Sequence, residues 1–166
     1  MSLVGVTLRP KTDADREFLC ALYASTRVEE LAQTDWTDEV KQAFLRSQFD
    51  AQTVHYEKHY YDAERSIIER DGTAIGRLYV YRGDPVDVRV VDIALVPGAR
   101  GSGIGASLLR QVMAEATAAG KSVSVHVEQF NPALRLYQRL GFDPVGTHGV
   151  YFLMRWSGNG RDAPTG

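Results

Sequence analysis

Hydrophobic and polar positions along this chain repeat with two periods, and each change of period marks the border of an element. Aliphatic and β-branched runs bounded by turn residues predict strands at 4–9, 66–70, 73–81, 86–96, 122–127, 144–147 and 150–156. Apolar residues at helical spacing predict helices at about 12–25, 37–54, 104–120 and 131–141. The predicted order is one strand, two helices, three strands, a helix, a strand, a helix and two strands.

Local signals mark several borders of these elements. Pro10 is expected to stop the first strand, and Thr12 or Asp13 can cap the first helix. Asp71-Gly72 predicts a two-residue hairpin turn, because such a turn needs positive φ at its central residues. The second helix is expected to carry one apolar stripe, made of Val40, Phe44, Leu45, Phe49 and Val54.

This order predicts one α/β (α+β) domain over residues 1–156, with a mixed, largely antiparallel sheet and flanking helices. One parallel crossover is expected around the helix that follows Gly103. Residues 157–166 are polar and rich in glycine and proline, so we expect a disordered tail.

The border between a strand and a helix at residues 92–106 is the most informative stretch. A β-branched run ends at Pro97, and Gly101, Gly103 and Gly105 follow before an amphipathic segment. Glycine lets the backbone turn sharply and approach a ligand, and the first N–H groups of a helix bind anions. Arg100 would add a full positive charge. The pattern therefore predicts a phosphate or pyrophosphate site.

Composition narrows the function classes. The 166 residues are 44% hydrophobic and 24% charged, as in an ordinary globular domain, and the net charge of −2 favours neither nucleic acid nor a membrane as a partner. Cys20 is the only cysteine, so neither an internal disulfide nor a cysteine-based metal site is expected. The first residues lack the apolar core of a signal peptide and the chain lacks a membrane-length apolar run, so we expect a cytoplasmic protein.

Two other kinds of phosphate-binding loop contain glycines in a similar pattern. Gly101-x-Gly103-x-x-Ala106 fits a dinucleotide fingerprint, with Glu128 as the ribose acid, but that fold needs repeated βαβ units and its glycines after the first strand. A Walker A loop is excluded because no Lys-Ser/Thr pair follows the glycines.

Two segments together resemble the GNAT acyltransferases. Arg100-Gly101-Ser102-Gly103-Ile104-Gly105, after a strand and Pro97, is similar to that family's acetyl-CoA pyrophosphate loop. Residues 131–142, Asn-Pro-Ala-Leu-Arg-Leu-Tyr-Gln-Arg-Leu-Gly-Phe, resemble its second motif, and the element order matches over roughly residues 3–156. The resemblance implies an N-acetyltransferase in which an amine attacks acetyl-CoA directly, without a metal.

The resemblance also implies where acetyl-CoA binds. The pantetheine arm would lie along the backbone of Ile93, Ala94 and Leu95, and the pyrophosphate on the loop Arg100, Gly101, Ser102, Gly103, Ile104, Gly105 and Ala106. Tyr137 matches the tyrosine that serves the CoA sulfur, although its apolar neighbours also suit a core tyrosine. Asn131 matches a pantetheine contact, but it lies six residues before Tyr137 where many relatives have seven, so it can instead be only a helix cap.

The sequence does not determine which residue is the general base. His126 and Glu29 rank first as catalytic candidates, ahead of Asp92 and Glu30, and a water chain to bulk is an alternative. Histidine titrates in the useful range, whereas each carboxylate also suits a structural or solvated position.

The acceptor is expected to be a small-molecule or peptide amine. Its pocket would use the helical region that holds Trp36, Tyr56, His59, Tyr60 and Tyr61, although these aromatics suit a core or a homodimer surface equally well. Acidic residues there favour a cationic amine: Glu29, Glu30, Asp35, Asp38 and Glu39. The alternative functions are a catalytically silent acyl-CoA-binding sensor or scaffold, and a dinucleotide-binding protein.

Overall fold

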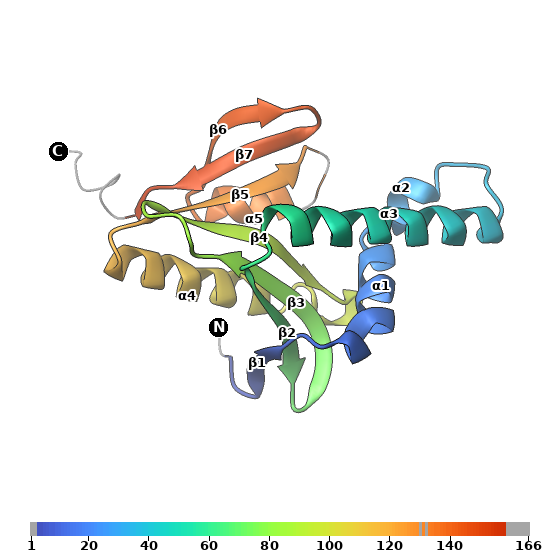
Figure 1. The fold of residues 1–166 in the computed structure, drawn as a ribbon, viewed down its shortest axis with the longest axis horizontal. Coiled ribbons are helices and arrows are strands. Elements are labelled where there is room, and N and C mark those ends of the chain that lie inside the picture. Colours follow the sequence, from blue (N-terminus) through green and yellow to red (C-terminus); the bar gives the residue numbers. More distant parts are fainter. Residues whose placement is uncertain (1–2, 130, 132, 159–166) are drawn as a thin grey trace.

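A seven-stranded sheet with helices on both faces forms the body of the protein (Figure 1). The computed structural model describes residues 3–129, 131 and 133–158. Its strands are β1 Val6–Pro10, β2 Glu64–Arg70, β3 Thr73–Tyr81, β4 Asp87–Leu95, β5 Ser122–Glu128, β6 Asp143–His148 and β7 Tyr151–Trp156. Its helices are η1 Asp13–Asp15, α1 Arg16–Ser25, α2 Val28–Leu31, α3 Asp38–His59, η2 Pro97–Ala99, α4 Ile104–Ala118 and α5 Ala133–Arg139.

The sheet has the order β1-β2-β3-β4-β5-β7-β6. β4 and β5 pair in parallel across the crossover through α4, and each other neighbouring pair is antiparallel. The mixed, largely antiparallel sheet and its one crossover confirm the predicted fold class. A dinucleotide fold, which repeats parallel βαβ units, does not have this topology.

Successive side chains of a strand point to opposite faces of the sheet, so a hydrophobic cluster forms on each face. On one face α4 and α5 cover the sheet, and Leu109 and Val112 pack in one cluster with Val90 and Val125. On the other face, α1 and α3 close a smaller cluster that contains Ile67 and Phe49. The site described below lies where β4 and β5 separate, between the two layers of helices.

The ends of β1 and one apolar stripe differ from the predictions. β1 ends at Pro10, but Pro10 is itself the last residue of the strand, paired with Ser66, where the prediction ended the strand at Arg9. An edge strand tolerates proline because one row of its N–H groups is not needed for pairing. The predicted stripe of α3 does not stay buried: Leu45 and Phe49 lie in the core, whereas Val40 is 47% and Val54 62% exposed. The first turns of the 22-residue helix, which hold Val40, project past the sheet (Figure 1). Val54 comes five residues after Phe49, so it lies on a different side of the helix from the buried residues.

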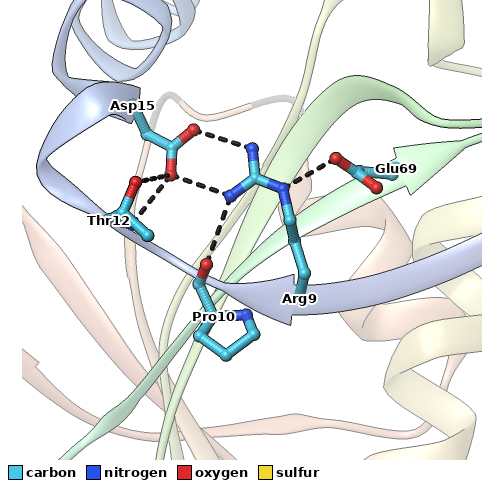
Figure 2. Close-up of polar contacts among 5 residues, drawn as sticks. All are labelled: Arg9, Pro10, Thr12, Asp15 and Glu69. Carbon is cyan, nitrogen blue, oxygen red and sulfur yellow. Dashed lines mark hydrogen bonds and ion pairs between the residues drawn. The ribbon is translucent and has the colours of Figure 1, made fainter.

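A charged cluster ties β1 to the helices that follow it (Figure 2). Arg9 binds the carboxylate of Asp15 with both terminal nitrogens, at 2.9 and 2.8 Å, and donates from Nε to Glu69 on β2 at 2.7 Å. The backbone N–H of Thr12 donates to the same Asp15 carboxylate at 2.8 Å. The hydrogen bonds from Arg9 lower the pKa of Asp15 to about 2. The cluster therefore fixes the direction in which the chain leaves β1 for α1.

Part of the predicted tail lies outside the described residues. Of residues 157–166, only Ser157 and Gly158 are described, and Pro132 in the second motif is also outside the described chain. No helix among the described residues is both long enough and apolar enough to cross a membrane.

Candidate active site

β4 and β5 separate at the centre of the sheet. Their pairing ends at Val90 and Val125. β4 then continues to Leu95 paired with β3, and β5 continues to Glu128 paired with β7. In the described chain, the β5-facing edge of Ile93, Ala94 and Leu95 is therefore without a strand partner. Such an edge can accept an extended ligand by backbone hydrogen bonds, as an added strand would.

The glycine-rich loop begins where that open edge ends. After η2, Gly101 and Gly103 have φ of +74° and +85°, a region that residues with a Cβ rarely adopt. Gly103 caps α4, and its carbonyl accepts the first helical hydrogen bond, from Ser107 N. The N–H groups of Ile104, Gly105 and Ala106 belong to the first turn, which has no acceptor within an α-helix. N–H groups of this kind, at the N-terminus of a 15-residue helix, are able to bind an anion.

The polar side chains of Arg100 and Ser102 form hydrogen bonds to neighbouring groups of the protein. The Arg100 guanidinium donates from Nε to the Leu95 carbonyl at 2.9 Å and from Nη2 to Ser25 Oγ on α1 at 3.1 Å. Ser102 Oγ donates to the Ala99 carbonyl at 2.8 Å. Arg100 therefore occupies one carbonyl of the open β4 edge in this structure.

Tyr137 lies on α5 in the core beneath the separated strands. It is 4% exposed, and its ring meets Phe142 edge to face at 5.6 Å between centroids. Burial raises the pKa of Tyr137, and the negative charge of Asp92 raises it further. At neutral pH its phenol is protonated and can donate a hydrogen bond.

Asn131 caps the helix that carries Tyr137. Its side-chain oxygen accepts from the backbone N–H of Ala133 at 2.8 Å, and its carbonyl accepts from Leu134 N at 2.9 Å. The capping interpretation of Asn131 is therefore present in the structure. A contact between Asn131 and pantetheine stays a prediction.

Asp92 belongs to a buried cluster that sequence reasoning did not find. Arg77 on β3 forms an ion pair with Asp92, and its Nη2 donates to Gln52 of α3 at 2.7 Å. The Tyr56 hydroxyl lies 3.5 Å from Asp92 Oδ2, and the Arg77 guanidinium lies 5.0 Å from the centroid of the Tyr79 ring. Burial raises the pKa of Tyr56 well above its usual value, and the charge of Asp92 acts in the same direction.

His126 lies on the same face of the sheet, at the first β5 position beyond the paired region. Its Nδ1 is 3.3 Å from Nη1 of Arg89. The same Nη1 donates to the Tyr60 hydroxyl at 3.0 Å, and Arg89 Nε donates to Ser124 Oγ at 2.7 Å. Guanidinium only donates, so Nδ1 accepts and the proton of a neutral imidazole is assigned to Nε2. Partial burial lowers the pKa of His126, and the charges of Arg89, His148 and His55 lower it further.

The other residues predicted to line the acceptor pocket are two glutamates and a set of aromatic residues. Glu29 is exposed on α2, and Glu30 is bound by Arg27 at 2.7 Å. Tyr56 and Tyr60 turn toward the sheet. The remaining predicted aromatics, Trp36, His59 and Tyr61, are exposed.

A bulge in the sheet explains how Asp92 reaches this face. Val80 pairs with Val90, but Tyr79 pairs with Asp92, so Val91 is one residue extra. Asp92 consequently shares the face of Tyr79 instead of that of Val90. The available signal was Arg77, the one charged residue of β3, together with Asp92 near the apolar end of β4. The structure thus brings Tyr137, Asp92 and His126 to the point where β4 and β5 separate.

A model of the acetyltransferase (GNAT) family matches residues 25–142. An uncharacterized N-acetyltransferase of Mycobacterium bovis is 33% identical over 99 residues. That match covers 57% of this chain and 64% of the relative, so the chain spans less than two thirds of the relative's length.

Solved structures agree in fold. The PaiA N-acetyltransferase of Thermoplasma acidophilum, in complex with coenzyme A, superimposes with a TM-score of 0.68 at 19% identity, covering 94% of this chain and 99% of that one. Spermidine N-acetyltransferase of Vibrio cholerae, in complex with CoA and spermine, gives 0.58 at 20% identity, covering 92% and 94%.

Proposed function

The chain belongs to the acetyltransferase (GNAT) family, and from this we propose that it transfers an acetyl group from acetyl-CoA to an amine. The amine would attack directly while both substrates are bound. The observation that carries the proposal is the open edge of β4 beside a glycine-capped helix N-terminus. An extended arm and a pyrophosphate need these two features side by side.

Acetyl-CoA would be held by the backbone of this region. The proposed contacts are the open edge at Ile93, Ala94 and Leu95 and the loop from Arg100 to Ala106, with Asn131 as a further contact. Gly105 suits close approach, because a Cβ there would lie 3.8 Å from Leu95 and 3.9 Å from Leu136, in the space between β4 and α5. Arg100 would have to leave the Leu95 carbonyl if pantetheine uses that group.

Tyr137 would serve the sulfur of the departing thiolate. When bound, acetyl-CoA would supply the acetyl group to the amine, and coenzyme A would leave as a thiolate as the C–S bond breaks. A phenol is already a weaker acid than an ordinary thiol, and the burial that raises the pKa of Tyr137 widens this difference. A hydrogen bond from the phenol to sulfur therefore suits Tyr137 better than complete proton transfer.

The amine must lose its proton, and we propose His126 for this role, with Glu29 as the second candidate. The lowered pKa of His126 leaves the imidazole neutral at pH 7. Because Arg89 occupies Nδ1 and the proton of the neutral ring is on Nε2, His126 can accept a proton at Nδ1 only after Arg89 moves away. Glu29 is on the exposed side of α2 and would act at the mouth of the acceptor site.

The acceptor is proposed to be a small or peptide amine, with a cationic amine favoured. Exposed carboxylates surround α2 and the start of α3, at Glu29, Asp35, Asp38 and Glu39. They would attract a positive substrate through the summed field of the surface. The polyamine-bound enzyme of Vibrio cholerae has the same fold, and this is compatible with such an acceptor.

A steady-state assay with acetyl-CoA and a panel of polyamines, amino acids and peptide N-termini tests the proposal. We expect release of free CoA that depends on one class of amine. The alternative is a catalytically silent acyl-CoA-binding sensor or scaffold. It predicts that CoA raises the melting temperature while no amine produces turnover.

A homodimer is proposed as the assembly, on the grounds of the pairing common in the family and of exposed aromatics. Trp36, Tyr61 and Tyr151 are 40%, 77% and 44% exposed. Light scattering at high micromolar concentration should give twice the 18.4 kDa chain mass, and a monomer would contradict this.

A further inference from the structure

Arg89 is a cation beside the proposed base, and no carboxylate contacts it directly. Its Nε donates to Ser124 Oγ at 2.7 Å, and its Nη1 donates to the Tyr60 hydroxyl at 3.0 Å and lies 3.3 Å from Nδ1 of His126. Within residues 3–129, 131 and 133–158, Arg89 forms no ion pair. All three of its partners are neutral groups, so none of these contacts balances the positive charge.

The Nη2 nitrogen of Arg89 has no partner and reaches solvent. It forms no hydrogen bond in the described chain, yet it is not enclosed, since Arg77 Nε is the one buried side-chain donor without a partner there. Arg89 as a whole is half-buried, and His126 beside it is exposed. A ligand on this face can therefore reach the guanidinium, whose fork of N–H groups matches the two oxygens of a carboxylate.

Asp87, the carboxylate two residues earlier on β4, does not balance Arg89. It is 7% exposed and meets Arg89 only through the hydroxyl of Ser124, which accepts from Arg89 Nε and donates to Asp87. Arg155 Nε lies 3.8 Å from Asp87 Oδ1 and supplies a counter-ion for it. The positive charge of Arg89 is therefore available to an anionic ligand.

Two further carboxylates lie near the separated ends of β4 and β5. Asp92 is paired with Arg77. Glu128 lies two residues after His126 on β5 and thus on the same face, and its carboxylate forms no ion pair or hydrogen bond within the described residues. Because Arg89 lies opposite the residue of β5 that precedes His126 on this face, the order along the face is cation, proposed base and carboxylate.

We propose that the acceptor is a basic amino acid, whose carboxylate binds Arg89 and whose α-amine is acetylated. Arg89 and His126 are in contact, so a carboxylate on one and an amine at the other must be close neighbours in the same molecule, as in an α-amino acid. Glu128 and the exposed carboxylates near α2 would attract the cationic side chain. The inference rests on the proposed acetyl transfer with His126 as the base, and it makes Arg89 the residue that selects the acceptor.

Binding of the substrate carboxylate would also free the base. A carboxylate accepts a stronger hydrogen bond from guanidinium than a neutral imidazole does, because both partners are charged. Arg89 would therefore turn from Nδ1 of His126 to the substrate. A proton of the α-ammonium group then passes to Nδ1, and the neutral amine that remains attacks the thioester carbonyl. An amine without a carboxylate leaves Arg89 on His126.

Basic amino acids and their matched derivatives test the carboxylate requirement. Lysine, ornithine and arginine are each compared with the neutral carboxamide and with the decarboxylated amine in a steady-state assay with acetyl-CoA. At least one amino acid should have a kcat/KM about tenfold or more above both of its derivatives, as expected for a lost charge-assisted hydrogen bond. NMR of the product should place the acetyl group on the α-amine.

The outcomes separate this inference from the proposed function. Equal or faster turnover of the carboxamides or decarboxylated amines, or acetylation of a side-chain amine, would overturn the inference while acetyl transfer stands. Turnover confined to amines of another class would do the same. Absence of turnover with every amine would overturn both.

Arg89→Gln and Arg155→Gln form the matched pair of variants. Arg155 pairs with Ser124 across β7 and β5, so each change removes one arginine from the same face of the sheet. In Arg89→Gln the preference for the amino acid over its carboxamide should fall to within about twofold, mainly through a higher KM for the amino acid. Arg155→Gln should keep a preference of about tenfold, because Arg155 does not touch the substrate.

A merely structural role for Arg89 predicts a different pattern. Turnover of the amino acid and of its carboxamide would then fall by the same factor, and the preference would stay. Melting temperatures report whether each variant is folded. An unchanged preference in a folded Arg89→Gln protein, or an equal loss of preference in Arg155→Gln, would overturn the assignment of Arg89.

Discussion

Arg77 on β3 and Asp92 on β4 form an ion pair whose two ends differ in burial. The Arg77 side chain is 4% exposed, whereas that of Asp92 is 19% exposed. The cation is enclosed by Tyr56, Tyr79 and Gln52. Water can reach the carboxylate but not the guanidinium. The Arg77 cation therefore needs Asp92 as its counter-ion more than the Asp92 carboxylate needs Arg77.

This asymmetry predicts unequal effects of removing either charge. Asp92→Asn leaves a buried cation without its counter-ion and should cost about 3–5 kcal/mol in the free energy of unfolding. Arg77→Met leaves a carboxylate that water can solvate and fills most of the space, so it should cost less. Urea denaturation of both variants measures the difference. Equal costs, or a larger cost for Arg77→Met, would contradict the burial argument.

Tyr137→Phe separates a catalytic phenol from a structural one. The change keeps the ring and its contact with Phe142 but removes the hydroxyl. If the hydroxyl serves the departing sulfur, turnover should fall at least about tenfold, with little change in CoA affinity or melting temperature. A structural hydroxyl would instead cost roughly 0.5–1.5 kcal/mol of stability with turnover near normal. The assay must be limited by chemistry, which a burst experiment establishes.

His126 gives the reaction a predicted pH dependence. Burial and the charges of Arg89, His148 and His55 lower its pKa, so the neutral base is lost only below the usual histidine range. The value of kcat/KM should therefore rise with pH through a pKa below about 6.5 and then stay level. His126→Gln should remove this acid limb, and Arg89→Gln should move it to higher pH. An unchanged limb in His126→Gln would exclude His126 as the base.

Asp15 gives the fold a separate dependence on acid. Its pKa is lowered to about 2 by the hydrogen bonds from Arg9, against about 3.9 in an unfolded chain. A depressed folded-state pKa contributes stability that is complete above the unfolded value and is lost as pH falls from about 4 to about 2. Asp15→Asn should thus destabilise the protein at pH 7, and its deficit relative to the parent should shrink at pH 3. Asp13→Asn, which leaves the Arg9 contacts intact, is the control. A deficit independent of pH would contradict the linkage.

Local signals predicted the parts of the fold that depend on neighbouring residues. Asp71 and Gly72 have φ of +53° and +84°, as the two-residue turn between β2 and β3 requires. Gly103 is left-handed at the strand-to-helix border, where the glycines were expected to let the backbone turn sharply. Thr37, at the predicted start of the helix over 37–54, caps α3 by accepting from Val40 N at 3.2 Å. These features follow from backbone preferences that each residue carries wherever it lies.

The cluster around Arg77 and Asp92 could not be predicted, because it depends on contacts between residues that are far apart in the sequence. By simple alternation Asp92 would share the face of Val90 and enter the core beneath α4; the bulge at Val91 reverses this. Which strand residues Tyr56 and Gln52 meet depends on where the long helix α3 crosses the sheet. Side-chain spacing alone does not determine that crossing, so Arg77 was missed.

Calorimetric titration of CoA tests the central claim that the loop from Arg100 to Ala106 holds its pyrophosphate. Gly103→Val is a poor probe, because φ of +85° would strain the fold itself. Gly105 has no positive φ, and a Cβ there makes only ordinary contacts, so Gly105→Glu should fold while placing bulk and negative charge at the anion site. Gly146→Glu, on β6 where a Cβ meets no atom within 4 Å, is the matched control. We predict that the parent and Gly146→Glu bind CoA alike and that Gly105→Glu binds at least about tenfold more weakly. A parent that does not bind CoA, or a folded Gly105→Glu protein that binds it as tightly as the parent, would contradict the account.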